Sequence, residues 1–353
     1  MEGPSPTPGY RPISATEGRA LVGRLLPDGV KDRTGWATDI YAAFAALDIP
    51  PTPENICAAV AVTAQESGFQ VDPVVPGLAG IARKEIDKRR ESAGIPRFVL
   101  DAALAIPSAN GKSYSERLDA VKTELQLSEI YEDFIGRVPF GKSFLADRNP
   151  VRTGGPMQVS VAFAEAFAAA KPYPYPVSGT IRREVFTRRG GLYFGIAHLL
   201  DYPAPYTRPL YRFADFNAGQ YASRNAAFQN AVTQVSGIPL ELDGDLLRYD
   251  HGQPASEPGS TELATRVLAQ RIDVSNEDIR RDLDRGKAQG FEQTRLYARV
   301  FGLADKVTGK PAPRAVLPQI PLHSPKITRN LTTDWFANRV EGRYQTCLQR
   351  MPV

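Results

Sequence analysis

The sequence contains few residues of the types that build redox, metal or membrane-spanning sites. It has 353 residues but only two cysteines, three histidines and two tryptophans. No run of eighteen apolar residues occurs, so we expect no membrane span. The histidines His198, His251 and His323 are far apart and lack metal-ligand spacing. We therefore expect neither a metal nor a cofactor.

The charge balance is close to neutral. Lys and Arg number 43 against 39 Asp and Glu, which leaves a formal net charge of +4. So small an excess does not predict a nucleic-acid partner, which needs clustered basic residues. Hydrophobic residues make up 42% of the chain, which excludes a disordered protein. The length predicts about two domains at roughly 100–200 residues each.

The two cysteines and the N-terminus leave the cellular compartment open. Cys57 and Cys347 could pair with each other or remain as two buried thiols. Residues 1–16 are rich in Pro, Ser and Thr, and we expect them to form a flexible leader. This leader carries no signal-peptide pattern, which fits either a cytosolic protein or a chain that begins after a removed signal. Its tether-like composition favours the second case.

The pattern of apolar residues predicts a mainly α-helical fold, because spacings of three and four recur and strict alternation is rare. Thr52 and Pro53 open a helix that ends at about Ser67, before Gly68. Ser113 with Glu116 resembles a capping box that leads a helix through Leu118, Val121 and Leu125. Further helices are expected at 19–26, 34–47, 161–170, 193–200 and 210–234, the last with a weak point at Gly219.

The composition changes along the chain and predicts a domain organisation. Residues 17–250 form the expected main domain, with a charged helical insertion at about 75–152. Residues 251–353 form a C-terminal helical extension, in which Ser275 opens the second of three helices. A Pro-rich arm at 311–325 is expected to pack on the core, before a last helix that runs to Arg350.

Glu66 stands out as a candidate catalytic acid. It follows a stretch without charge from Ile56 to Gln65, and helical spacing places it on one face with Ala59 and Val62. Burial would raise the pKa of such a carboxyl, which suits a general acid near neutral pH. Most single glutamates at helix ends are solvated or structural, so this position alone does not establish catalysis.

Four short motifs, in order, resemble those of the lytic transglycosylases, lysozyme-like enzymes that cleave peptidoglycan. Glu66-Ser67-Gly68-Phe69 resembles the Glu-Ser-x-Phe signature that carries the single catalytic glutamate of that family. The segment from Gly155 through Met157 and Gln158 to Val159 is similar to the Gly-Leu-Met-Gln-Ile motif. Gly195–Leu200 resembles a Gly-x-x-Tyr-Leu helix, and residues 215–219 resemble an Ala-Tyr-Asn-Ala-Gly block.

The resemblance implies a lysozyme-like helical core and a function. Glu66 would be the acid and base that cleaves the bond between N-acetylmuramic acid and N-acetylglucosamine, forming 1,6-anhydro ends. It further implies peptidoglycan as partner, a monomer, and a periplasmic location with an outer-membrane lipid anchor attached upstream of Met1. The implied substrate-binding residues are Ser67, Gly155, Met157, Gln158, Tyr211, Phe216 and Asn217.

The sequence departs from the family at several points, so two alternatives stay open. Phe216 replaces a tyrosine, which favours a peptidoglycan-binding or scaffold protein without turnover; Tyr211, Tyr193 or Tyr221 could supply a hydroxyl instead. A muramidase-type hydrolase would need a second carboxylate. Asp215 and Asp72 are the candidates, although Asp215 could instead cap a helix and Asp72 could turn the chain.

Tyrosines in Pro-rich loops could offer ring faces to sugars, although such rings pack on their own scaffold just as often. A basic segment near residue 185 could likewise meet the peptide carboxylates of peptidoglycan, but charge runs are usually solvated. The loop tyrosines are Tyr173, Tyr175, Tyr202 and Tyr206, and the basic residues are Arg152, Arg182, Arg183, Arg188 and Arg189.

Overall fold

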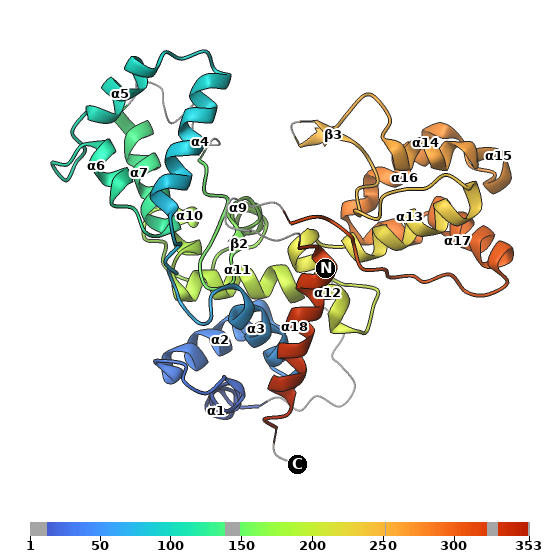
Figure 1. Cartoon of the computed structure of the whole chain (residues 1–353). Helices are drawn as coiled ribbons and strands as arrows, with labels where there is room; N and C mark the ends of the chain where they lie inside the picture. Colours follow the sequence, from blue (N-terminus) through green and yellow to red (C-terminus); the bar gives the residue numbers. More distant parts are fainter. Residues whose placement is uncertain (1–12, 138–148, 251, 323–330, 352–353) are drawn as a thin grey trace. The chain divides into compact units, whose positions relative to one another are not determined.

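A computed structural model of the chain (Figure 1) describes residues 13–137, 149–250, 252–322 and 331–351. Most of the predicted leader, His251, His323 and the end of the Pro-rich arm lie outside these residues. Over the described part, the fold is mainly α-helical, as the apolar spacing predicted. The strands within it are two short antiparallel hairpins. In that part, no helix is long and apolar enough to cross a membrane.

The chain divides into two compact units. The first contains residues 1–27, 47–65 and 196–353, and the second contains residues 28–46 and 66–195. Expected domain borders near residues 75, 152 and 250 do not coincide with this division. The boundary instead passes through α2, α3 and α11, at residues 46–47, 65–66 and 195–196.

The first unit joins the N-terminal helices to the C-terminal half of the chain. Its elements are α1 (Ala15–Leu25), α3 (Pro53–Glu66), α12 (Pro209–Ala218), α13 (Ala222–Ser236), β3 (Tyr249–Asp250), β4 (Gln253–Pro254), α14 (Ser260–Val267), α15 (Ala269–Ile272), α16 (Asn276–Asp284), η2 (Arg285–Lys287), η3 (Gln289–Gln293), α17 (Arg295–Thr308) and α18 (Thr333–Leu348). In α18, Tyr344 packs its ring 5.7 Å from that of Phe213 in α12.

A large apolar core holds the helices of the C-terminal half together. Phe228 of α13 packs its ring 5.1 Å from Phe291, and both side chains are fully buried together with Phe301 of α17. Burying such rings removes apolar area from water, which is the main favourable term in folding. The Pro-rich arm follows this core, because Val316 and Gln319 donate backbone hydrogen bonds to Ser223 and Leu242.

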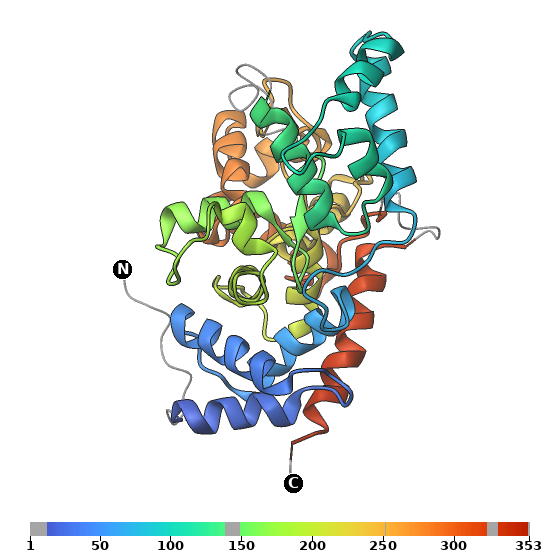
Figure 2. The same ribbon diagram turned by 90° about the vertical axis from the view of Figure 1, so that its left-hand side faces the viewer.

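A disulfide joins two helices that are far apart in the sequence. Cys57 of α3 and Cys347 of α18 are bonded across 290 residues and are fully buried. The two helices lie side by side in both views (Figures 1 and 2). The structure therefore resolves the choice that the cysteine count left open.

The second unit contains the remaining elements. These are α2 (Arg33–Leu47), α4 (Leu78–Ser92), α5 (Arg97–Ala105), α6 (Tyr114–Asp119), α7 (Glu124–Arg137), β1 (Thr153–Gly154), β2 (Val159–Ser160), α9 (Val161–Ala170), α10 (Ile181–Val185) and α11 (Arg188–Leu200). Helices α4 to α7 share an apolar cluster around Tyr114 and Leu118, which Phe186 also joins. The segment predicted as an insertion thus supplies most of a separate apolar cluster, to which Phe186 contributes.

Helix boundaries follow local chemistry, and two predicted helices are split. The capping box of Ser113 with Glu116 is present, but α6 ends at Asp119 rather than continuing to Leu125. The helix predicted over 210–234 is interrupted at Gly219, whose φ of 108° ends α12 before α13 begins. The residue predicted as a weak point is a complete break, because such a φ is compatible with glycine but not with a helix.

Candidate functional site

Glu66 is the last residue of a buried helix. Residues 56–63 of α3 are all buried, whereas Glu66 itself is half-buried. The chain then turns sharply, because Gly68 and Phe69 both have a positive φ, of 59° and 63°. A positive φ is strained for phenylalanine. Its ring is held by an edge-to-face contact with Trp36, at 5.1 Å between centroids.

Ser67 connects this turn to the second motif of the resemblance. Its side chain is buried at 7% exposure, and its hydroxyl donates a 2.8 Å hydrogen bond to the Pro156 carbonyl oxygen. The two residues are 89 positions apart in the sequence. The structure therefore brings the glutamate motif and the Gly155–Val159 motif together within the second unit.

The Gly155–Val159 motif forms the turn between β1 and β2. Gly155 has a φ of 72°, and a Cβ atom there would lie 2.0 Å from the Val185 carbonyl oxygen, so only glycine fits. Gln158 is also left-handed, with a φ of 50°. Its side-chain amide donates to the Gly155 carbonyl oxygen at 3.2 Å and its amide oxygen accepts from Thr153 at 3.3 Å. The Gln158 side chain thus holds its own turn, with further donor and acceptor capacity left over.

Met157 fixes the turn against helix α11. Its side chain is fully buried, and a Cβ at Gly195 would lie 2.5 Å from the Met157 sulfur. The third motif, which begins at Gly195, therefore needs its glycine for close packing. Gly155 and Met157 are both buried in this structure, and Met157 is fully so. Their contact with substrate stays a prediction.

Asp215, in the first unit, is a buried hydrogen-bond centre. It is 1% exposed, and its carboxylate accepts from the backbone N–H groups of Tyr221 at 3.0 Å and Ser223 at 2.7 Å. It also accepts from the hydroxyls of Tyr202, at 3.0 Å, and Tyr206. Because Tyr221 and Ser223 lie at the start of α13, the Asp215 carboxylate caps that helix.

Burial raises the pKa of the Asp215 carboxyl to about 6, and the hydrogen bonds that it accepts oppose part of this rise. A carboxylate that accepts hydrogen bonds from four donors and has almost no exposed surface has a structural role. The structure therefore favours the capping role that the sequence left open for Asp215, and gives it no position from which to activate water.

Phe216 packs against the histidine of the third motif. Its side chain is 9% exposed, and its ring lies 5.1 Å from the His198 imidazole. The Nε2 atom of His198 lies 3.2 Å from the Phe216 carbonyl oxygen. Burial lowers the pKa of His198 to about 4, with the hydrogen bond to Phe216 opposing it. At neutral pH, His198 is therefore uncharged, and its Nε2–H group donates to that carbonyl.

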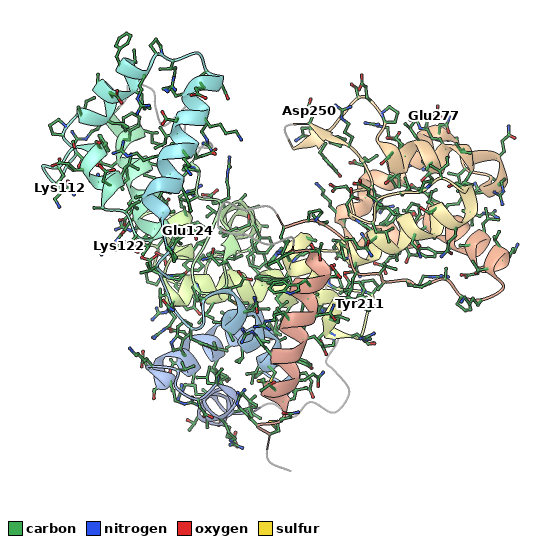
Figure 3. All side chains as sticks on the ribbon, in the orientation of Figure 1. Lys112, Lys122, Glu124, Tyr211, Asp250 and Glu277 are labelled. Atoms are coloured by element: carbon green, nitrogen blue, oxygen red, sulfur yellow. A yellow bond between two sulfur atoms is a disulfide. The ribbon has the colours of Figure 1, made fainter. Side chains whose placement is uncertain are left out.

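Asn217 and Tyr211 are the more accessible residues of the same helix. Asn217 is exposed, and its amide oxygen accepts a 3.0 Å hydrogen bond from Thr333, the first residue of α18. Tyr211 (labelled in Figure 3) is half-buried, with its ring 5.4 Å from that of Tyr206. By contrast, Tyr193 and Tyr221, the other proposed hydroxyl donors, are buried.

Asp72, the other candidate for a second carboxylate, belongs to the second unit. It is half-buried in a bend that follows the Glu66 turn, in agreement with a chain-turning role. Among the described residues, no group of three or more His, Cys, Asp and Glu is arranged to hold a metal ion.

Some of the aromatic and basic loop residues pack on their own scaffold. Tyr173 stacks on Phe194 at 5.1 Å and donates to the Glu184 carboxylate at 3.1 Å. Arg188 forms ion pairs of 2.6 Å with both Asp32 and Asp39. By contrast, the side chains of Arg152, Arg183 and Arg189 are exposed.

The sequence analysis missed one group of residues. Arg339, Arg343 and Arg350 line a hollow of the first unit, together with Val60, Ala61 and Ala64 of α3. The available signal was the spacing of four residues between Arg339 and Arg343 on the last helix, with Arg350 just after its end.

The chain belongs to the family described as "Protein of unknown function (DUF1615)", whose match covers residues 29–350. It is 55% identical over 346 residues to a protein of Escherichia coli (strain K12) described as "Uncharacterized protein YaiW". That alignment covers 98% of this chain and 93% of the relative. No solved structure matches.

Proposed function

We propose that this member of the DUF1615 family is a peptidoglycan lytic transglycosylase with a lysozyme-like core, and that Glu66 is its single acid and base. The observation that carries the proposal is the hydrogen bond from Ser67 to Pro156. It joins two short motifs that the resemblance expects at one site, although 89 residues separate them. Chance matches to short patterns would have no reason to meet in the fold.

The position of Glu66 supports acid catalysis. A buried, uncharged stretch of α3 precedes it, and the sharp turn at Gly68 and Phe69 follows it. A general acid must reach the atom that it protonates, and half-burial leaves Glu66 partly accessible. The turn is fixed by the Trp36 contact and by the Ser67 hydrogen bond, so the carboxyl is attached to a rigid support.

One carboxyl is sufficient for the proposed reaction. Glu66 first donates its proton to the glycosidic oxygen, and the bond from that oxygen to the anomeric carbon of the muramyl sugar breaks. The Glu66 carboxylate then takes the proton of the muramyl 6-hydroxyl, whose oxygen forms the new bond to the anomeric carbon. The glutamic acid is regenerated and no water is consumed. The burial of Asp215 fits this scheme better than hydrolysis, which requires a second accessible carboxylate.

The disulfide supports a location outside the cytoplasm. Cys57 and Cys347 are paired, and disulfides persist in oxidising compartments such as the bacterial periplasm. We propose a periplasmic protein held at the outer membrane by a lipid anchor, which places it beside its substrate.

A binding protein without turnover is the second candidate. Phe216 lacks the hydroxyl of the family's tyrosine, and its ring packs on His198. Of the three tyrosines that could replace it, only Tyr211 is more than marginally exposed. If that hydroxyl is required, the chain would retain peptidoglycan without cleaving it.

Digestion of purified peptidoglycan distinguishes these functions through the masses of the products. Anhydro-ended fragments are expected, each lighter than the hydrolysis product by one water. Fragments with reducing ends would instead support a muramidase-type hydrolase. Retention of the protein on peptidoglycan with no released fragment would support the binding protein and contradict turnover.

A further inference from the structure

The residue that precedes Glu66 is held by the C-terminal helix. Gln65 is half-buried in the last turn of α3, and its amide oxygen accepts a 3.0 Å hydrogen bond from the Nε–H group of Arg343 on α18. The two residues are 278 positions apart in the sequence. Because the last carbonyl groups of a helix lack intrahelical partners, the last turn is the part that frays most readily. A side-chain contact there restrains the backbone that carries Glu66.

A second attachment joins the same two helices. The disulfide links Cys57 of α3 to Cys347 of α18, and both residues are fully buried. Along α3, Cys57 and Gln65 are about 12 Å apart at a rise of 1.5 Å per residue. Since the higher-numbered residue of α3 meets the lower-numbered residue of α18, the two helices run antiparallel. Two separate attachments fix the direction of α3 as well as its position, which one attachment alone would not do.

Helix α18 is itself held within the first unit. Its Tyr344 side chain is buried, and the ring lies 5.7 Å from that of Phe213 in α12. The hydroxyl of Thr333, at the start of α18, donates a 3.0 Å hydrogen bond to the Asn217 side chain in the last turn of α12. In both views, α18 lies beside α3 (Figures 1 and 2). The half-buried Arg343 side chain therefore contacts Gln65 from a helix that is fixed in place.

We propose that Arg343 is a positioning residue for the proposed acid: through Gln65, it fixes the last turn of α3 and thereby the place of the Glu66 carboxyl. This inference rests on the proposed function. A general acid must lie within hydrogen-bond distance of the oxygen that it protonates, so a small displacement of the acid slows proton transfer. An interaction that acts only in the transition state lowers kcat and leaves KM nearly unchanged. Loss of the Arg343 hydrogen bond should have this effect.

The proposal is tested by a double-mutant cycle on the full chain, with cleavage of soluble peptidoglycan strands as the readout. Arg343→Met keeps the aliphatic part of the side chain but removes the donor, and Gln65→Leu removes the acceptor. Each should lower kcat by about tenfold at nearly unchanged KM. The two together should also lower kcat by about tenfold, because both remove the same hydrogen bond. Urea denaturation of each variant gives its folded fraction, so that kcat is compared per folded molecule.

Two further variants separate positioning from a general loss of structure. Arg343→Lys retains a donor and should keep more of the wild-type kcat than Arg343→Met does. Arg350→Met removes an arginine from the same hollow, just after the end of α18, and is the matched control. It should cleave with the kcat and KM of wild type.

Several results would overturn the proposal. A double variant whose kcat falls by about a hundredfold would show that the two side chains act independently. An equal loss of kcat in Arg350→Met, or no advantage of Arg343→Lys over Arg343→Met, would contradict a role for this particular hydrogen bond. If wild type releases anhydro-ended fragments and Arg343→Met matches its kcat, only the positioning role is wrong. If wild type releases no such fragments, the proposed function fails and this inference fails with it.

Discussion

Each compact unit contains a carboxylate from one of the motifs, and the surroundings of the two carboxylates differ. In the second unit, Glu66 is half-buried at the end of α3, and the next residue, Ser67, is buried and hydrogen-bonded to Pro156. In the first unit, Asp215 and Phe216 are buried and their side chains are used for packing and helix capping. A carboxylate with one accessible face can exchange a proton with a ligand, whereas one surrounded by four donors stabilises the fold.

This difference supports the proposed catalytic role of Glu66 and a structural role for Asp215. It predicts that substitutions in the two motifs affect different measurements. Changes at the Glu66 turn should alter turnover more than unfolding, and changes at Asp215 should do the reverse. The predictions below test this separation, from the largest expected effect to the smallest.

The largest effect is expected for Glu66→Gln, which keeps the shape of the side chain but removes its titratable proton. Peptidoglycan turnover should fall by about 10²–10⁴-fold, the usual contribution of a general acid or base. Binding and the free energy of unfolding should remain near wild type. Glu54→Gln in the first turn of α3 is the matched control; it should keep full turnover and lose at most about 1 kcal/mol of stability. Wild-type turnover by Glu66→Gln would defeat the assignment.

Removing the disulfide should cause the largest change in stability. Replacing Cys57 and Cys347 together by serine frees a loop of 290 residues in the unfolded chain. The free energy of unfolding should fall by about 2–5 kcal/mol, measured by urea denaturation. Wild-type protein unfolded in the presence of reductant should show a similar loss. An unchanged midpoint of urea denaturation would show that the disulfide contributes nothing to the free energy of unfolding.

Asp215→Asn should destabilise the first unit. The Asp215 carboxylate accepts hydrogen bonds from four donors. An amide in its place would point its own N–H group at one of these donors, so that hydrogen bond would be lost. The free energy of unfolding should fall by about 2–3 kcal/mol. Turnover per folded molecule should stay near wild type. Asp72→Asn, in a half-buried bend, should cost less than about 0.5 kcal/mol and serves as the control. Loss of turnover in well-folded Asp215→Asn would reassign Asp215 to catalysis.

The low pKa of His198 predicts that acid destabilises the first unit. The unfolded imidazole binds a proton near its ordinary pKa of 6.5, whereas the folded one does so only at about 4. Stability contributed by the neutral imidazole is therefore complete above pH 6.5 and is lost as pH falls towards 4. His198→Gln should remove about 2 kcal/mol of this pH dependence, after allowance for partial solvent exposure.

The Asp215 carboxyl affects the pH dependence of stability in the opposite direction, because its pKa in the folded protein lies above its ordinary value of 3.8. That contribution decreases as pH rises from 3.8 to about 6. It is common to wild type and His198→Gln, so it cancels when their urea denaturation curves are subtracted at each pH. A difference that stays constant between pH 7 and pH 4 would contradict the shifted pKa of His198.

Ser67→Ala should have the smallest effect on stability. It removes the hydrogen bond to the Pro156 carbonyl and should cost about 1 kcal/mol. Because that bond positions the Glu66 turn, kcat should fall while KM changes little. Ser92→Ala at the exposed end of α4 controls for the loss of a hydroxyl. An unchanged kcat would show that the hydrogen bond does not position the acid.

Local chemistry allowed much of the helical fold to be predicted from the sequence. Ser113 with Glu116 formed the expected capping box, and Gly68 ended α3, because these signals act within a few residues. The break between α6 and α7 was missed, since Leu118 and Leu125 keep a helical spacing across it. Apolar spacing reports which residues are buried, but not whether the backbone is continuous between them.

The candidate site was only partly predictable, because many of its contacts join residues that are far apart in the sequence. The uncharged stretch before Glu66 singled it out as a candidate, which stays a prediction, but the sequence gave no indication that Met157 would be buried against Gly195. It offered Asp215 as a second carboxylate, because the tyrosine hydroxyls that surround it come from residues nine and thirteen positions earlier in the chain. Contacts that depend on tertiary packing, such as the pairing of Cys57 with Cys347, need the fold itself.

Digestion of peptidoglycan in water enriched in heavy oxygen tests the central claim most directly. If Glu66 moves a proton between two oxygens of the substrate, the new glycan ends contain no oxygen from solvent. Mass spectrometry should therefore find anhydro ends without the heavy isotope, and Glu66→Gln should form none. Heavy oxygen at each new reducing end would mean that water is the nucleophile, and would contradict the single-carboxyl mechanism.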